Sequence, residues 1–303
     1  MSELSSTASA VKPEGRGRSR CAAIIGVLVL TALLAGCSAL RLGYTQGPTL
    51  AYWWLDSYLD FDDAQRIKAR DALAQWFAWH RKTELPQLAA LLGRAASEVT
   101  ADATAEQACR WVETFQPRID AAFEQALPAV AEIAVTLRPE QIDAMRKRQV
   151  RANDEFREEY LQPKTEARQK AALERTLERA EMLYGRFSAP QRDKLQEIIN
   201  ASSFDAERWL ADRQRRQRDL LQTLQALQGA GMGRNEAVSA LRGYWQRSRK
   251  SPDEAYARYA QQLNNYNCAA AAQVHNLTTA AQRLEAQKRL RGWEADLRSL
   301  NAP

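Results

Sequence analysis

Four acidic residues form the densest cluster of reactive side chains in the sequence: Asp56, Asp60, Asp62 and Asp63. Asp56 and Asp60 are four residues apart and would share one face of a helix. Two carboxylates so placed could bind Ca²⁺ or act as a general acid and base. The same residues suit a helix start, where Asp60 or Asp62 would be the N-cap and acids interact favourably with the helix dipole. We take the structural role as the main interpretation and catalysis by Asp56 and Asp60 as the alternative.

The chain has two histidines, and neither predicts a metal site. His80 lies near apolar residues such as Trp76, which is typical of a hydrogen-bonded core histidine. His275 follows Cys268 by seven residues, or about two helical turns, but a zinc site needs more soft ligands nearby. The sequence also lacks a glycine-rich phosphate loop, an HExxH pair and a GxSxG elbow. We therefore expect no cofactor and no metal.

The first 36 residues have the pattern of a secretory signal. Basic residues between positions 12 and 20 precede the uncharged run CAAIIGVLVLTALLAG, residues 21–36, which is shorter than the roughly 20 residues that span a bilayer. The junction Leu34-Ala35-Gly36-Cys37 resembles the lipobox of bacterial lipoproteins. That resemblance implies cleavage before Cys37 and lipidation of its thiol and amine, for example with palmitate. Ser38 replaces the aspartate of the inner-membrane retention signal, so we expect an outer-membrane anchor facing the periplasm.

The charge balance argues against a nucleic-acid partner. Residues 1–36 hold four of the 43 basic and two of the 37 acidic residues, so the remaining chain has an excess of only four basic residues. This small excess is unlike the one-sided basicity of nucleic-acid binders. One basic run does stand out, at Arg213, Arg215, Arg216 and Arg218. Such a run is usually a solvated helix face, and contact with an acidic lipid or a client protein is the alternative.

Helical periodicity dominates the chain after residue 48. Apolar residues recur at steps of three to five in residues 108–127, 256–270 and 290–300, and β-branched residues and glycine are sparse. We predict an all-α, multi-helix bundle of seven to ten helices, some long and kinked, with no sheet. Residues 37–47 would be a linker and residues 48–303 the body, with a division into two sub-bundles near residues 186–204 as an option.

Tyr52, Trp53 and Trp54 follow closely after the predicted anchor. Three adjacent residues of a helix cannot all face one core. Core packing is the general expectation for the aromatic residues of this chain. For Trp53 and Trp54 the alternative is a position among lipid headgroups, where aromatic rings are favoured.

Five segments begin helical stretches with one pattern, in which a glutamine follows a capping position by three residues. Four read as capping boxes, ending at Gln65, Gln107, Gln191 and Gln282, and the fifth, Leu137-Arg138-Pro139-Glu140-Gln141, has no small cap. Residues 137–141 and 187–191 also resemble the paired LTxxQ motif of the Spy/CpxP family of periplasmic helical proteins. That resemblance implies a chaperone-like protein that binds unfolded clients. Arg138 and Phe187 depart from the motif, and the match covers about a quarter of the mature chain.

A wider resemblance covers the whole mature chain. The lipobox, the segment RLGYTQGPTLAYWWLDSYLDFDDAQ, the CRW at 109–111 and the C-terminal HNLTTAAQRLEAQKRLRGWEADLR resemble an uncharacterised DUF-type lipoprotein family of Gram-negative bacteria. This resemblance implies an envelope location and a helical fold, and it implies no activity.

The four cysteines predict one disulfide bond. Cys21 would leave with the signal peptide and Cys37 would carry the lipid, which leaves Cys109 and Cys268 in the oxidising periplasm. Cys268 shares a helix face with small residues, which allow a second helix to approach. We predict a Cys109–Cys268 bridge, with two buried free thiols as the alternative.

Together these features predict a non-enzymatic envelope protein. It would be attached to the membrane by its lipid and would bind another envelope protein or an unfolded client in a groove between helices. The alternative is an enzyme that acts on envelope polymers through Asp56 and Asp60. A deep, closed pocket with converging acids would favour the enzyme, and a broad groove would favour the binding protein.

Overall fold

The computed structural model describes residues 38–229 and 233–301, and this part of the chain is helical throughout, with no strand. The all-α prediction is confirmed. Eleven helices are present in the described residues, more than the seven to ten expected, because short helices form near the start of this part of the chain and between longer ones. They are α2 (Ser38–Thr45), α3 (Gly47–Leu59), α4 (Asp63–Glu98), α5 (Ala105–Ala134), α6 (Pro139–Tyr160), α7 (Thr165–Tyr184), α8 (Ala189–Asn200), α9 (Ala206–Gly229), α10 (Arg234–Arg249), α11 (Glu254–Asn276) and α12 (Ala280–Asn301).

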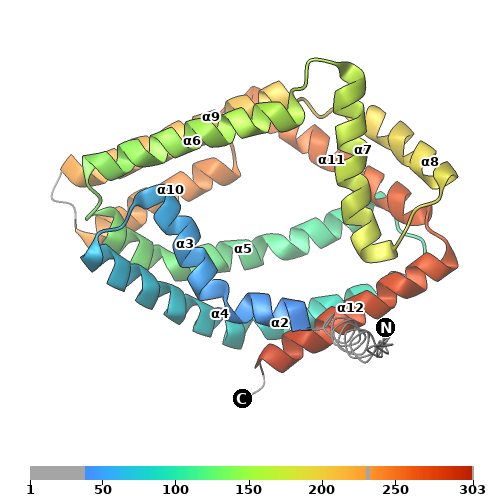
Figure 1. The fold of residues 1–303 in the computed structure, drawn as a ribbon, viewed down its shortest axis with the longest axis horizontal. Coiled ribbons are helices and arrows are strands. Elements are labelled where there is room, and N and C mark those ends of the chain that lie inside the picture. The colour runs from blue at the N-terminus through green and yellow to red at the C-terminus, as the bar shows by residue number, and fades with distance from the viewer. Residues whose placement is uncertain (1–37, 230–232, 302–303) are drawn as a thin grey trace, which may run out of the picture.

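The helices form an elongated, open arrangement (Figure 1). Along its upper edge in this view α6 lies beside α9, and along its lower edge α4 lies beside α12. Helix α5 runs between these edges and packs on α4, α10 and α11. Helices α7 and α8 pack on each other at the right-hand end. Segments far apart in sequence are therefore neighbours, and the C-terminal helix α12 packs along the much earlier α4.

Long helices form the frame, as predicted. Helix α4 has 36 residues with Pro86 inside it, and α5 has 30 residues with Pro117 and Pro128 inside it. Each internal proline removes one backbone donor and tends to kink a helix. The close pairing of α4 with α12 depends on small residues, since Ala89, Ala96 and Ala286 are fully buried there.

The core is divided into several clusters, and the largest joins distant parts of the chain. It contains Leu127 of α5, Ile142 of α6, Leu221 of α9 and Leu241 of α10. Residues from both sides of the 186–204 segment therefore share one core, and the chain does not separate into two sub-bundles at that segment. A second cluster, at the opposite end, packs Leu177 of α7, Phe187 of the following turn and Leu195 of α8.

The segment expected to be a linker is mostly helical. Helix α2 packs on α12 and continues almost directly into α3. Gly47 is needed at the junction, since a Cβ there would lie 2.5 Å from Cε1 of Phe77 in α4. Tyr44 contributes by packing edge-on against the Phe77 ring. The helical body thus begins at Ser38, the first residue after Cys37, and Cys37 itself lies outside the described residues.

Four of the five glutamine motifs meet in two pairs at opposite ends of the molecule. At the left-hand end in Figure 1, where α4 and α6 begin, Gln65 Nε2 lies 3.2 Å from Gln141 Oε1, and Gln141 Nε2 lies 2.7 Å from Gln65 Oε1. At the other end Gln191 of α8 and Gln282 of α12 form the equivalent pair, with N–O distances of 2.8 and 3.3 Å. The capping boxes were predicted, but their pairing was not.

Each paired glutamine has two tasks. Its side-chain oxygen accepts the backbone N–H of its own N-cap residue: Asp62, Arg138, Ser188 or Thr279. Its amide nitrogen donates to a carbonyl in the turn before the partner helix: Thr136 for Gln65, Leu59 and Asp60 for Gln141, Leu277 for Gln191, and Arg186 for Gln282. One side chain therefore caps one helix and holds the end of another.

We predict strong coupling within the buried pair. Replacing Gln141 with alanine leaves Gln65, which is 2% exposed, without its amide partner and should cost about 1–3 kcal/mol. In a double-mutant cycle measured by denaturant unfolding, Gln65→Ala and Gln141→Ala should be non-additive, whereas Gln65→Ala and Gln282→Ala, at opposite ends, should add.

Gln107 provides the matched control, since it caps Thr104 of α5 by the same local motif but has no glutamine partner. Gln107→Ala should cost about 1 kcal/mol or less. Equal costs for Gln107→Ala and Gln141→Ala, with an additive Gln65–Gln141 cycle, would show that the pairing contributes nothing beyond capping.

Candidate functional site

An open cleft of about 1550 Å³ lies between the helices of the described residues. Residues of α6, α7, α8, α9 and α11 line it, together with Tyr58 at the end of α3. These helices occupy the upper and right-hand parts of Figure 1. The volume exceeds the roughly 300–1,000 Å³ of ordinary small-molecule pockets. It is a broad cleft of the kind expected of a binding protein.

One wall of the cleft is a ladder of aromatic rings. Phe156 of α6 stacks on Tyr160 one turn later, with ring centroids 4.5 Å apart, and on Trp209 of α9, with centroids 4.7 Å apart. Phe204 approaches Tyr160 edge-on and is 41% exposed. Arg175 of α7 covers the outer face of Tyr160, 4.1 Å from its centroid. Such stacking fixes the rings as flat, rigid contact surfaces.

The charges around the cleft balance. Four arginines line it, Arg168, Arg175, Arg179 and Arg213, together with four acids, Glu155, Glu159, Asp205 and Glu207. The lining also includes aliphatic side chains from α8 and α11, namely Leu195, Ile198, Ile199, Leu263 and Val274. The cleft therefore offers an apolar and aromatic lining with charges of both signs.

A buried tyrosine–histidine pair lies at the α11 side of the cleft. The hydroxyl of Tyr184 is 2.8 Å from Nδ1 of His275, and Nε2 of His275 is 2.7 Å from the carbonyl oxygen of Ala101. Because a carbonyl only accepts, Nε2 carries the proton, and in the neutral ring Nδ1 accepts from Tyr184. Burial raises the pKa of Tyr184. Both ring nitrogens are thus used for structure.

Comparison with models of protein families identifies the family of this chain. A family model described as DUF6279, a family of unknown function, matches residues 57–241. The chain belongs to the DUF6279 family. This agrees with the predicted resemblance to an uncharacterised DUF-type family. No curated protein and no solved structure matches the chain, so the Spy/CpxP resemblance gains no support.

The DUF6279 match covers most of the cleft but not all of it. It includes α4 to α9, and with them the aromatic ladder, and it ends within α10 at Leu241. Helices α11 and α12 lie after it, so the α11 side of the cleft comes from the chain beyond the matched region.

Of the predicted arginine run, only Arg213 lines the cleft. Its guanidinium lies 5.7 Å from the Trp209 ring centroid. Arg215 and Arg216 instead bind the buried carboxylate of Asp212, at 2.7 and 3.0 Å. Arg218 is exposed. Arg215 and Arg216 stay partly exposed, at 21% and 33% of their side-chain surface, while Asp212, three and four residues earlier, pairs with both.

The acidic cluster has structural roles. Asp56 Oδ1 accepts the backbone N–H of Phe61, and Asp60 ends α3 with a left-handed backbone, φ 48°. Asp62 is the N-cap of α4, and its other oxygen pairs with Arg138. The backbone N–H of Gln65 and the nearby Arg138 hold the pKa of Asp62 below its usual value, despite some opposing desolvation. Asp56 and Asp60 lie outside the cleft lining.

The remaining predicted site residues separate from one another. His80 is half-buried, and its Nδ1 lies 2.9 Å from the Tyr44 hydroxyl, within hydrogen-bonding distance. Burial lowers its pKa, and Glu84 acts in the opposite direction. Trp53 and Trp54 are exposed on α3, away from the cleft lining, while Tyr52 is buried. Within residues 38–229 and 233–301 no three metal-ligating side chains gather, and no helix is long and apolar enough to cross a membrane.

Sequence reasoning missed the aromatic ladder, because it assigned nearly all the aromatic residues to the core. A usable signal was present in the spacing. Phe156 and Tyr160, like Trp209 and Arg213, are four residues apart and must share a helix face. What the sequence could not show is that α6 and α9 place these two faces against each other.

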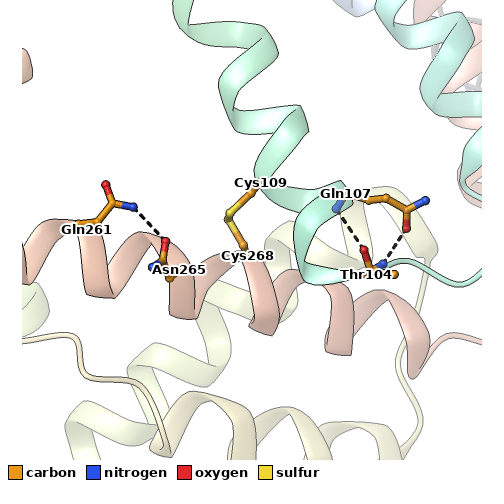
Figure 2. The surroundings of a disulfide bond; sticks show 6 residues. All are labelled: Thr104, Gln107, Cys109, Gln261, Asn265 and Cys268. Carbon is orange, nitrogen blue, oxygen red and sulfur yellow. Dashed lines mark hydrogen bonds between the residues drawn. A yellow bond between two sulfur atoms is a disulfide. The ribbon is translucent and has the colours of Figure 1, made fainter.

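The predicted disulfide bond joins Cys109 of α5 to Cys268 of α11, with Cα atoms 5.2 Å apart (Figure 2). The geometric condition for the bridge is therefore met. Figure 2 shows the bridge one turn beyond the Thr104–Gln107 cap, where the start of α5 crosses the middle of α11. The zinc site considered for Cys268 and His275 is not formed, because both residues have other partners.

We predict that this bridge constrains the unfolded chain. Cys109→Ser/Cys268→Ser should lower the free energy of unfolding, by up to about 5 kcal/mol in the chain-entropy model for a separation of 159 residues. Denaturant unfolding measures the loss, and a reductant should destabilise the wild type but not the double variant. Thiol titration is the direct check: Cys109 and Cys268 should react only after unfolding and reduction together, and reaction on unfolding alone would contradict the bridge.

Proposed function

We propose that this DUF6279 protein is an outer-membrane lipoprotein that faces the periplasm and binds an extended or unfolded polypeptide in the cleft. The observation that carries the proposal is the lining of the cleft, in which stacked aromatic rings and aliphatic side chains alternate with balanced charges. A polypeptide segment presents the same mixture of apolar and charged groups. An anionic polymer or nucleic acid would instead be matched by an excess of positive charge.

The form of the cleft supports binding over catalysis. It is open and larger than a typical substrate pocket. Asp56 and Asp60, the acids of the catalytic alternative, lie at the end of α3, where Asp56 Oδ1 accepts the backbone N–H of Phe61 and Asp60 has a left-handed backbone. Rigid aromatic rings give large contact area at small cost in side-chain entropy. The cleft thus has the properties of a surface that holds a chain without reacting with it.

The sequence and the bridge support the location. The basic stretch, the short apolar run and the lipobox-like junction at Cys37 together favour export and lipidation. The Cys109–Cys268 disulfide favours an oxidising compartment such as the periplasm. A thioether-linked diacylglycerol and an amide-linked acyl chain would hold the protein far more firmly than a single acyl chain.

We predict that Cys37 carries the lipid. Metabolic labelling with a radioactive fatty acid should mark the wild-type protein, and Cys37→Ala should abolish the label. Cys21→Ala is the matched control, since Cys21 lies in the predicted signal peptide and its loss should leave the label unchanged. Label that persists in Cys37→Ala would contradict the anchor.

We predict that the cleft binds unfolded polypeptide. The purified protein should bind a reduced, carboxymethylated model protein that cannot fold, measured by fluorescence anisotropy. Phe204→Ser and Arg179→Ser change exposed residues of the cleft, so both should keep the fold. Each should weaken binding several-fold, and a tenfold loss would correspond to about 1.4 kcal/mol.

Leu284→Ser supplies the matched control. Leu284 is 59% exposed on α12 and does not line the cleft, so its replacement removes a similar apolar surface elsewhere. Binding that is absent in the wild type, or that Leu284→Ser weakens as much as Phe204→Ser does, would contradict a specific role for the cleft.

A further inference from the structure

An exposed apolar face runs along α2 and α3, on the side opposite to their packing surface. Within α3, Leu50, Trp53 and Trp54 follow one another at steps of three and one, so they share one face. Their exposed fractions are 52%, 60% and 62%. Leu42 of α2, 65% exposed, lies about two turns before Leu50. We call Leu42, Leu50, Trp53 and Trp54 the tryptophan face.

The two helices present this face as one unit. Backbone hydrogen bonds from Gln46 to Leu42 and from Leu50 to Gln46 carry the helical pattern across the junction. On the opposite side Tyr52 is buried against Phe61 and the α4 residue Ala69. The inner side of α3 is thus fixed to the protein, which leaves the tryptophan face held in place and directed outward.

Charge is scarce along these helices. Among the 13 residues of α3 the single ionisable group with a charge at neutral pH is Asp56, which is occupied by the N–H of Phe61. In α2 the one charged residue is Arg41, which pairs with Asp296 of α12. Two adjacent indole rings, each more than half exposed on an almost uncharged helix, are unusual in a chain in which a quarter of the residues are charged.

The position of the face in the chain indicates its partner. Helix α2 begins at Ser38, directly after Cys37, so a lipid on Cys37 would leave no slack between the bilayer and the body. Tryptophan is the residue type most favoured at the membrane–water interface, with its ring among the headgroups. In Figure 1, α2 and α3 cross in front of α4 on the near side, where such a surface could approach the protein as a whole.

We propose that the tryptophan face docks on the bilayer surface beside the anchor, so that the body lies against the membrane in one orientation instead of swinging on its lipid. This inference rests on the proposed lipid anchor at Cys37. With docking, the protein contacts the membrane over an area and not only through its lipid. This is because Leu42, Leu50, Trp53 and Trp54 extend over about three helical turns from the anchored end.

The test is quenching of tryptophan fluorescence by bromine in the lipid. The full chain is purified from envelopes and reconstituted into vesicles of phosphatidylethanolamine and phosphatidylglycerol with part of the acyl chains brominated. The wild type should be quenched relative to unbrominated vesicles, and Trp53→Phe/Trp54→Phe should lose most of that quenching. Trp209→Phe/Trp293→Phe, which removes two indoles from other helices, should keep it.

Two outcomes would overturn the inference: no quenching in the wild type, or equal quenching in Trp53→Phe/Trp54→Phe. Circular dichroism of each variant checks that the helical content is unchanged, and phenylalanine at two exposed positions should not disturb packing. A tryptophan face covered by another protein instead of lipid would give the first of these outcomes.

The anchor and the face can fail separately. Intact mass of the purified chain reports the lipid at Cys37, whereas quenching reports the contact of Trp53 and Trp54. If the mass shows no lipid, the proposed anchor is contradicted. A Cys21→Ser chain is then coupled through Cys37 to a maleimide lipid in the same vesicles, with Cys109 and Cys268 bridged, and the quenching decides on the face as before.

Discussion

The backbone N–H groups at a helix start have no partner within the helix, and this constraint governs how the molecule is closed at both ends. At the left-hand end of Figure 1 the starts of α4 and α6 meet, and the side chains of Gln65 and Gln141 are buried between them. Gln65 and Gln141 solve the problem reciprocally, since each caps its own helix and donates to the turn before the other. A side-chain amide is suited to this because it has a donor and an acceptor on one rigid plane.

The same arrangement recurs at the opposite end, where Gln191 and Gln282 join the starts of α8 and α12. Four residues before each glutamine a side chain enters the interior, namely Phe61, Leu137, Phe187 and Thr278, all buried. The two pairs thereby set how four helix junctions meet, and the long helices between them have little freedom in direction. Helix α6 starts at one of these pairs and α8 at the other, and both line the cleft, where the aromatic face of α6 meets that of α9.

Local features of this structure were predictable, and features that depend on a distant partner were not. Asp62 and Thr104 could be recognised as caps because the cap and its glutamine lie three residues apart. The pairing of Gln65 with Gln141 joins residues 76 positions apart, and a single sequence carries no sign of it. The disulfide was an exception, because elimination among four cysteines left one pair. For Arg215 and Arg216 a local signal was available but unused, since Asp212 lies three and four residues earlier, at the helical spacing of an ion pair.

Helix α11 is joined to the start of α5 by hydrogen bonds as well as by the disulfide, and this determines what the disulfide contributes to stability. Near Cys109 and Cys268, Asn276 of α11 exchanges two hydrogen bonds with the backbone of Ala103, and Nε2 of His275 donates to Ala101. All of them tie the turn before α5 to α11, so the native contact does not depend on the bridge for its geometry. The bridge then acts mainly on the unfolded chain, by excluding extended states in which these segments are far apart. The restriction stabilises this fold because the joined segments are distant in sequence. Without the bridge, α11 and α5 would have to come together across 159 residues of chain before any of these hydrogen bonds could form.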